Sequence, residues 1–334
     1  MTPVRAFAAA ALVSCLSAAA PAQNLDKVSF GTNWLAEAEH GGFYQSVTDG
    51  TYRKYGLDVT IVPGGPQVNN HILVPVGRLD FSMNANTLQN FDAVEHNVPT
   101  LAVAAMFQKD PQALMAHPDQ GIERFTDLRS FTIFMSTGVL TSYFQWLKAE
   151  YGFTDAQVKP YLSNLQPFLA DKRSAMQGYL TSEPYAIEKA AGFKPKIFLL
   201  ADQGFNSYST LIETRRELVE KRPELVQRFV DASIIGWMNY LYGDNRAANA
   251  MIKRQNPEMT DELLTYSIDK MKEYGIVDSG DAGSLGVGAM TNARMRDFYD
   301  KMVRAGVSKP QIALDKAYTL QFVNKRVGLD LRPR

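Results

Sequence analysis

Cysteine is almost absent from this sequence, with Cys15 standing alone among 334 residues. Cys15 lies in an N-terminal segment that is typical of a removable leader, so we expect the mature chain to contain no thiol. Such a chain forms no disulfide bond and has neither a thiolate nucleophile nor sulfur ligands for a metal. A chain of this length buries enough apolar surface to fold without cross-links.

Histidine and the common catalytic motifs are also scarce. The four histidines, at positions 40, 71, 96 and 117, lack the close spacing of a helical metal site. No G-x-S-x-G nucleophile elbow occurs. The glycine-rich stretch 279–288 lacks G-x-G-x-x-G and follows no predicted strand, which favours a loop over a nucleotide cradle. We therefore expect no catalytic residues, no metal and no cofactor.

An excess of charge and a long internal apolar run are missing as well. Lysine plus arginine and aspartate plus glutamate each number 35, and no basic cluster interrupts the balance, so nothing points to nucleic acid. Beyond the N-terminal segment, no apolar run approaches the ~20 residues of a membrane span. These absences favour a soluble exported protein.

The first 22 residues predict a secretory signal peptide. Arg5 precedes an alanine-rich apolar run, and Ala20-Pro21-Ala22 forms a small-x-small cleavage site. In an alternative interpretation, Leu12-Val13-Ser14-Cys15 is a bacterial lipobox, and Cys15 would anchor the mature protein to the membrane as a lipoprotein. Both routes lead to a periplasmic location.

Short strand patterns alternate with helical patterns along the rest of the chain. We expect strands at 28–34, 57–62, 80–83, 100–106, 131–135, 178–183 and 196–201, and an extended run from 207. A helix is predicted at 40–55, and a longer one from Pro223 to Gly243 presents one apolar face. This rhythm is typical of mostly parallel sheets with helices on both faces.

The restart of the rhythm near residue 109 predicts two α/β lobes. The first lobe is discontinuous, at 24–107 and 206–334, and the second is inserted at 108–205. Two extended crossovers, near Gln108 and Gln203, would form the hinge.

Several segments carry a family resemblance. They include "NWLAEAEHGGFYQSVTDGTYRKYGLDVTIVPGGP", "GRLDFSM", "FQKDPQALMAH", "LRSFTIFMS", "GYLTSEPYAIEKAAG", "LLADQGFNSYSTLI" and "ASIIGWMNYLYG". In order and spacing they resemble the pyrimidine (thiamine-precursor) substrate-binding proteins of ABC importers, relatives of the alkanesulfonate- and riboflavin-binding proteins. The resemblance implies a type II periplasmic binding fold: two α/β lobes, a two-crossover hinge and a ligand in the cleft between them.

One wall of that cleft is expected after the first strand. Trp34 stands at a strand end, where open α/β sheets bind ligands, and its indole offers a stacking face for a flat ring. Asn33 is a candidate polar partner and His40 a candidate ligand contact. The pair Gly41-Gly42 at a helix start either opens backbone N–H groups to the ligand or is a packing feature.

The opposite wall is expected at Glu183 and Tyr185 in the second lobe. A carboxylate is suited to the exocyclic amine of an aminopyrimidine, and a tyrosine ring can cover its other face. The remaining candidates for neutral hydrogen bonds stand at predicted strand ends or the hinge: Asn84, Gln108, Ser136 and Tyr208. Gly64-Gly65-Pro66 is interpreted as a plain turn.

The sequence therefore predicts a monomeric, extracytoplasmic receptor that is not an enzyme. Its expected partners are a small aromatic nitrogen heterocycle and an ABC permease with its ATPase. Alternative ligands are riboflavin, a sulfonate or an aromatic acid; an anion would require a cation such as Lys109. A pyrimidine-precursor synthase is less favoured, because the resemblance implies a cysteine-rich iron motif for that branch. A sensory receptor stays open.

Overall fold

The computed structural model describes residues 24–334 except positions 66–67, 69, 141, 163 and 334. The predicted signal peptide and the lipobox at Cys15 lie outside the described residues. Within the described part of the chain, no helix is both long and apolar enough to cross a membrane.

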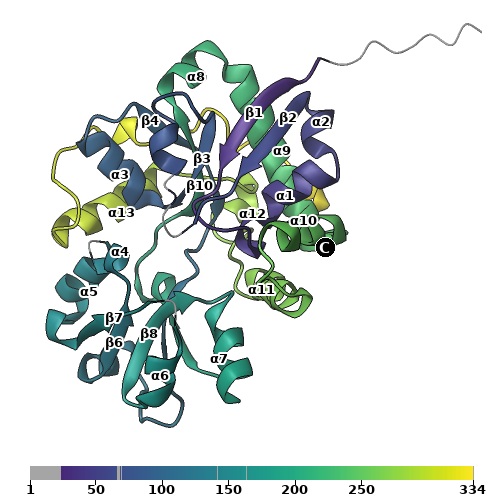
Figure 1. Ribbon diagram of the computed structural model, residues 1–334. Helices are drawn as coiled ribbons and strands as arrows, with labels where there is room; N and C mark the ends of the chain where they lie inside the picture. The colour runs from purple at the N-terminus through teal and green to yellow at the C-terminus, as the bar shows by residue number, and fades with distance from the viewer. Residues whose placement is uncertain (1–23, 66–67, 69, 141, 163, 334) are drawn as a thin grey trace, which may run out of the picture.

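Two five-stranded sheets form the framework (Figure 1). The first has the order β2-β1-β3-β10-β4 and the second the order β7-β6-β8-β5-β9. The strands of the first sheet are β1 (Asp26–Gly31), β2 (Leu57–Val62), β3 (Phe81–Asn86), β4 (Thr100–Phe107) and β10 (Ser209–Arg215). Those of the second sheet are β5 (Gln112–Ala116), β6 (Thr132–Met135), β7 (Val158–Pro160), β8 (Ser174–Tyr179) and β9 (Lys196–Leu199).

The helices divide between the two sheets. Around the first sheet are α1 (Gly41–Thr48), α2 (Thr51–Lys54), α3 (Thr87–Glu95), α8 (Arg216–Lys221), α9 (Pro223–Tyr242), α10 (Arg246–Gln255), α11 (Asp261–Glu273), α12 (Ala282–Leu285) and α13 (Asn292–Arg304). Around the second are α4 (Thr137–Leu140), α5 (Tyr143–Tyr151), α6 (Gln166–Ala170) and α7 (Glu183–Ala191). We call these assemblies lobe 1 and lobe 2, and keep 24–107 with 206–334 and 108–205 as their proposed boundaries.

Both sheets are mixed, each containing parallel and antiparallel pairs. β1 runs parallel to β2 and β3, and β6 runs parallel to β7 and β8. The antiparallel strands are β10, between β3 and β4, and β5, between β8 and β9. β5 and β10 are the first strands after the two crossovers, so each enters its sheet from the side opposite to the β–α–β units.

Local chemistry explains the predicted elements that the structure confirms. All eight residues of β4 are buried, as expected for a strand covered on both faces. Helix α9 begins at Pro223, and its predicted apolar face, including Phe229 and Trp237, is buried. The Phe229 ring stacks on that of Phe81 at 4.1 Å, which anchors the helix to β3.

Two predicted elements differ in extent, and one strand was not predicted. The helix expected over 40–55 is divided into α1 and α2 at Gly50, which adopts a positive φ of 75°. The strand expected at 178–183 is β8, which ends at Tyr179 because the chain turns there into α7. β5 was not predicted as a strand, although its apolar run pairs with both β8 and β9.

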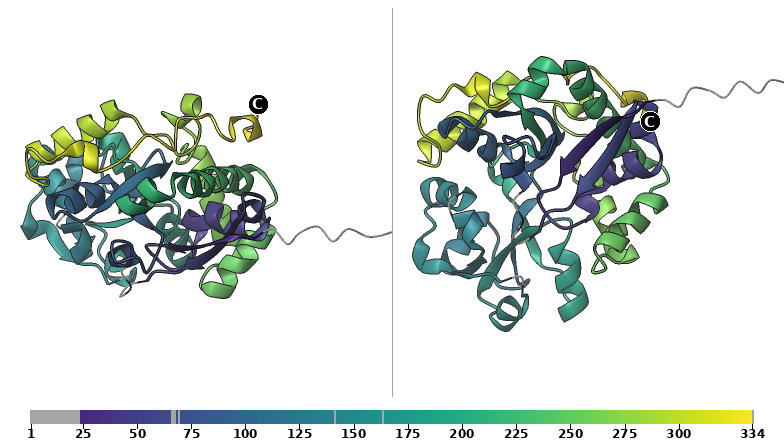
Figure 2. Two further views of the ribbon diagram at one scale, coloured as in Figure 1. Left: turned by 90° about the horizontal axis from the view of Figure 1, so that it is seen from above. Right: turned by 45° about the horizontal axis from the view of Figure 1, so that its top comes forward.

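The C-terminal segment covers the edge of the first sheet. Tyr318 bridges to Ala102 of β4, with hydrogen bonds from Ala102 to Ala317 and from Thr319 back to Ala102. Figure 2 shows this segment, at the yellow end of the colour scale, running over the outside of lobe 1. An edge strand covered in this way does not pair with another chain.

Candidate functional site

The loop after β1 is fixed by its backbone contacts. The Thr32 hydroxyl donates to the Trp34 carbonyl, and the Gly64 amide donates to that same carbonyl at 3.0 Å. A Cβ on Gly64 would lie 2.6 Å from the Thr32 carbonyl oxygen and 2.8 Å from the Trp34 nitrogen. Gly64 is therefore required by a close approach of two chains, a role beyond the plain turn predicted for it.

The backbone of Trp34 is fixed in this loop, whereas its side chain is exposed to solvent. It is 40% exposed, which is unusual for a tryptophan in a well-packed domain. Further along, the Asn256 amide donates to the Ala36 carbonyl, so the loop is anchored on both sides of the indole. The arrangement suits a rigid stacking platform.

His40 supports this loop from inside. It is fully buried, and burial lowers the pKa of its imidazole to about 3, so the ring is neutral. Its Nε2 lies 3.1 Å from Asn33 Oδ1 and 3.5 Å from Glu37 Oε1. An imidazole facing two acceptors carries its proton on Nε2, and His40 thereby orients Asn33 and Glu37 from behind.

The pair Gly41-Gly42 is a packing feature. A Cβ on Gly41 would lie 2.0 Å from the Tyr240 ring, and one on Gly42 would lie 2.3 Å from the Trp237 ring. Both rings belong to α9, so the glycines let α1 pack closely against that helix. Of the two interpretations open from the sequence, the structure supports close packing.

Lobe 2 contributes Glu183, the first residue of α7. Its carboxylate accepts a hydrogen bond from the Tyr179 amide at 2.7 Å. The side chain folds back over Gly178, where a Cβ would lie 2.9 Å from both the Glu183 Cβ and Cγ. Gly178 thus fixes the orientation of Glu183, which remains partly exposed.

The two lobes meet through a side-chain hydrogen bond. The Thr181 hydroxyl, next to α7, donates to Glu39 Oε1 in the loop after β1. Both residues are buried. Because Glu39 and Thr181 belong to different lobes, this bond lies at the junction where a closing receptor would enclose its ligand.

Four acidic side chains lie in this part of the fold: the charges of Glu37, Glu39 and Glu183 act on one another, and Asp110 acts together with Glu183 on Tyr143. We call them the carboxyl cluster. Burial raises the pKa of Glu39 to about 7, against a favourable bond from Thr181, and Glu183 raises it further. Burial, followed by repulsion from Glu39 and Glu183, raises the pKa of Glu37 well above its ordinary value. Burial also raises the pKa of Asp110 to about 7 and that of Glu183.

Helix α11 closes one side of the junction. The Ser267 hydroxyl donates to the Thr181 carbonyl at 2.7 Å, and the Tyr266 hydroxyl donates to Leu180. The Tyr185 ring packs against Tyr266 with centroids 5.5 Å apart. Tyr185 therefore has an aromatic partner in α11, and its predicted stacking role on the ligand stays a prediction.

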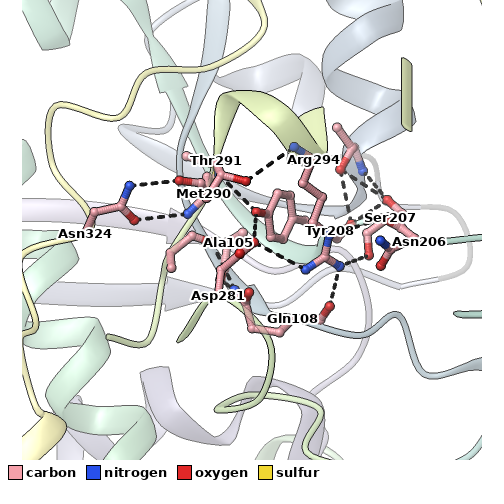
Figure 3. A network of polar contacts seen from close by, with 12 residues as sticks. Ala105, Gln108, Asn206, Ser207, Tyr208, Asp281, Met290, Thr291, Arg294 and Asn324 are labelled. Atoms are coloured by element: carbon pink, nitrogen blue, oxygen red, sulfur yellow. Dashed lines mark hydrogen bonds and ion pairs between the residues drawn. The ribbon is translucent and has the colours of Figure 1, made fainter. Parts of the chain in front are cut away.

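Gln108 and Tyr208 stand at the two crossovers, within a network that includes Arg294 of α13 (Figure 3). The Arg294 guanidinium donates to the backbone carbonyls of Gln108 and Ser207 and lies 4.0 Å from the centre of the Tyr208 ring. The Tyr208 hydroxyl donates to Asp281 at 2.5 Å. We call these five residues the crossover network. Their buried contacts suit a hinge, so direct ligand contacts by Gln108 and Tyr208 stay predictions.

The contacts given for Asn84 and Ser136 are with residues outside the carboxyl cluster. Asn84 is fully buried on β3, beside His71, whose Nδ1 lies 2.5 Å from Glu213. Burial opposes protonation of His71, but the Glu213 carboxylate and the Asn84 amide raise its pKa. The backbone amide of Ser136 donates to the Gln177 side chain at 2.7 Å.

Sequence reasoning missed the acidic character of this junction. Glu37 and Glu39 have no acidic partner nearby in the sequence, because Glu183 follows more than 140 positions later. Asp110 and Thr181 carried no motif. The available signal was the pair of acids two positions apart within the loop already assigned to the ligand, with no lysine or arginine between Thr32 and Thr51.

Metal chemistry finds no support at this junction. Among the residues that the structure describes, no group of three or more histidine, cysteine or acidic side chains is arranged to hold a metal ion. Lys109, the one cation considered for an anionic ligand, lies 3.4 Å from Asp202 instead.

The family of the chain follows from comparison with known proteins. Residues 37–247, more than half of the sequence, match the family described as NMT1/THI5 like. The chain belongs to the NMT1/THI5-like family. The matched region begins at the first glutamate of the carboxyl cluster and includes all of lobe 2.

Individual relatives share the length and the fold. The riboflavin-binding protein RibY of Chloroflexus aurantiacus is 25% identical over 331 residues, covering 91% of this chain and 89% of RibY. The periplasmic aliphatic sulphonate binding protein SsuA of Escherichia coli has a TM-score of 0.66 at 10% identity, covering 87% and 91% of the two chains. The desulfurization enzyme DSZB has a TM-score of 0.56 at 14% identity, covering 91% and 99%. The type II periplasmic binding fold is thus confirmed, and it is shared by binding proteins and an enzyme.

Proposed function

We propose that this chain is the extracytoplasmic substrate-binding protein of an ABC importer, and that it holds a small aromatic nitrogen heterocycle between its lobes. Acidic side chains from both lobes meet at one junction, beside an exposed tryptophan on a fixed loop, and this observation carries the proposal. A receptor of this fold works by placing groups of both lobes on one ligand.

Each part of the junction has a role in this proposal. The Trp34 indole stacks on the ring, and Glu183 accepts from an exocyclic amine. His40 keeps Asn33 in position from behind. The work is desolvation, stacking and fixed hydrogen bonds, with no chemical step. The closed form, as a monomer in the periplasm, would be recognised by the permease and its ATPase.

Riboflavin is the second candidate ligand, favoured by the full-length similarity to RibY. A flavin also presents a flat nitrogen-containing ring for the Trp34 platform. A sulfonate is less suited to the carboxyl cluster, because like charges repel at a buried site. The pyrimidine-synthase alternative lacks the cysteine motif that it would require.

A thermal-shift screen of the purified protein against pyrimidines, flavins, sulfonates and aromatic acids tests the ligand class. A ligand present at about 100 times its dissociation constant stabilises the native state by about 2.7 kcal/mol. We expect a pyrimidine to raise the melting temperature most. Stabilisation by flavins alone would select riboflavin, and no response to any class would overturn the proposal.

Two variants then test the site. Trp34→Ala removes the stacking face and Glu183→Gln removes the negative charge. Each is expected to lower the affinity for the ligand found in the screen by about tenfold or more. Retention of wild-type affinity in both would show that the ligand binds elsewhere. We expect both variants to fold, because Trp34 is exposed and Glu183 is partly exposed. Circular dichroism checks this.

A further inference from the structure

The carboxyl cluster brings together more acidic side chains than a neutral ring would need. We propose that the ligand bears a positively charged arm, an ammonium or amidinium group, which is held by Glu37 and Glu39 of lobe 1 together with Glu183 of lobe 2. This inference rests on the proposed function, because it assigns the ligand's charge at the same junction.

The geometry leaves acceptor oxygens free to meet such an arm. Glu39 uses one oxygen for Thr181, and Glu183 accepts one backbone N–H from Tyr179. The Glu37 side chain is 19% exposed and Glu183 is partly exposed, so both are reachable from outside. A carboxylate accepts about four hydrogen bonds, and each of these groups therefore retains capacity for charged N–H donors.

Tyr143 provides an independent indication of a ligand. It is 2% exposed, and its hydroxyl makes no hydrogen bond within the described structure. Burial raises the pKa of that hydroxyl, and repulsion from Asp110 and Glu183 raises it further, so the hydroxyl lies within reach of two members of the carboxyl cluster. A buried phenol without a partner is costly unless a ligand group completes its bonding.

Among the residues that the structure describes, no lysine or arginine is paired with a member of the carboxyl cluster. The groups that shift the pKa values of its four members include no lysine or arginine. The titratable groups that face it from the surrounding elements are neutral at pH 7: His40 of the loop after β1, Tyr44 of α1, Tyr143 of α5, Tyr161 after β7, Tyr179 of β8 and Tyr240 of α9. Buried acids without a counter-charge mark a functional site more often than a structural one.

Binding of a cation has a proton signature. The raised pKa values mean that the ligand-free cluster holds protons near neutral pH. A positively charged arm favours the ionised carboxylates and displaces protons from them. A neutral ligand of the same shape has no such effect, so proton release distinguishes charge recognition from simple shape recognition.

Two sets of probes separate charge from ring type. The first contains 4-aminopyrimidines with an aminomethyl, hydroxymethyl or carboxylate group at the 5-position, and the second contains benzamidine, benzamide and benzoate. Titration calorimetry at pH 7.5, in two buffers of different ionisation heat, gives affinity and the number of protons released. We expect the cation of a set to bind at least about tenfold more tightly than its neutral analogue and to release protons.

Matched variants locate the effect. Glu39→Gln keeps an acceptor for Thr181 while removing charge, and with Glu37→Gln it should reduce the preference for the cation to within about twofold. Glu188→Gln on the exposed side of α7 changes the net charge equally and should leave the preference unchanged. If Glu188→Gln were equivalent to Glu39→Gln, general electrostatic attraction would explain the preference and the inference would be wrong.

The outcomes distinguish the two proposals. Equal binding of aminomethyl- and hydroxymethyl-pyrimidine would overturn the cation inference and leave the heterocycle receptor standing. Binding of benzamidine without any pyrimidine would support the cation and overturn the heterocycle. Failure of both positively charged probes would overturn the inference, whatever the screen of flavins, sulfonates and aromatic acids then showed.

Discussion

The carboxyl cluster and the crossover network are both largely buried and polar. They differ in whether their acidic side chains are paired with a cation. In the crossover network, the Arg294 guanidinium meets Asp281, two backbone carbonyls and an aromatic face. In the carboxyl cluster, burial raises the pKa values of Glu37 and Glu39, repulsion from Glu183 raises both further, and no lysine or arginine of the described residues is among the groups that act on them. A compensated network holds a structure in place, whereas an uncompensated one is available for a ligand.

Position in the fold reinforces this contrast. Arg294 donates to backbone carbonyls of both crossover segments, at Gln108 and at Ser207. Glu39 and Glu183 belong to different lobes, so their separation depends on closure. In the proposed receptor, the first set of contacts would act as a pivot at the crossovers and the second as a contact that changes on closure.

Removal of Arg294 is the largest perturbation that we predict. Arg294→Leu leaves Asp281 without its cation and the crossover carbonyls without a donor. The free energy of unfolding is expected to fall by about 4 kcal/mol, as measured by urea denaturation. Arg296→Leu, on the exposed side of the same helix, is the control and should change stability little. A small effect of Arg294→Leu would mean that the crossovers are held by other contacts.

The carboxyl cluster predicts an unusual dependence of stability on pH. The Glu39 carboxyl has a folded-state pKa of about 7 against an ordinary 4.5, so the folded protein holds this proton more tightly than the unfolded chain. This contribution to stability is complete below pH 4.5 and is lost as the pH rises through 7. The loss is roughly 3 kcal/mol for the ligand-free protein.

Urea denaturation at pH 5 and pH 8 measures this effect. His71 titrates in the same direction and His40 in the opposite one, so the comparison is between wild type and Glu39→Gln. The variant should lack most of the Glu39 contribution and be the more stable protein at pH 8. Identical slopes for the two proteins would show that Glu39 ionises as it does in water.

Gly178→Ala is predicted to disturb the cluster through packing alone. The new methyl group would lie 2.9 Å from the Glu183 side chain and force the carboxylate away from the Tyr179 amide. We expect a loss of about 2 kcal/mol in the free energy of unfolding, together with weaker ligand binding. Gly192→Ala, which has open space but a positive φ of 73°, is a control for backbone strain without contact to Glu183. If Gly178→Ala bound the ligand normally, the orientation of the Glu183 carboxylate would not matter for ligand binding.

The bond between the lobes gives the smallest expected effect. Thr181→Val removes the hydroxyl that donates to Glu39 and should lower the free energy of unfolding by about 1 kcal/mol. A double-mutant cycle with Glu39→Gln isolates this coupling from the rest of the cluster. A coupling energy near zero would indicate that solvent replaces the bond without cost.

The sequence predicted the parts of the fold whose signals are local. Three features could be read directly from the sequence: the all-apolar run of β4, the amphipathic face of α9 and the end of that helix at Gly243. Strand and helix periods are properties of neighbouring residues. β5 escaped prediction because it is a run of only five residues directly after the predicted crossover. The α1–α2 break was missed because a single glycine does not reveal its positive φ.

The loop that we propose as one wall of the ligand site was likewise chosen from the sequence, since Asn33-Trp34 follows a clear strand. The reason for Gly64 and for Gly41-Gly42 was not accessible there. Each of these glycines is required by a chain or a ring that approaches from a distant part of the sequence. Sequence identifies a glycine, and only the fold shows what would collide with a side chain in its place.

The sequence by itself determined the two-lobed α/β class and the absence of cysteine from the described residues, and it led to the loop that we propose as a wall of the ligand site. Only the tertiary structure decided which charges share that site. Glu37, Glu39 and Glu183 are ordinary surface-type residues in sequence, and their pKa values rise because folding removes water from them and brings them together without a cation. Desolvation and charge repulsion depend on distance in space, which local sequence patterns do not encode.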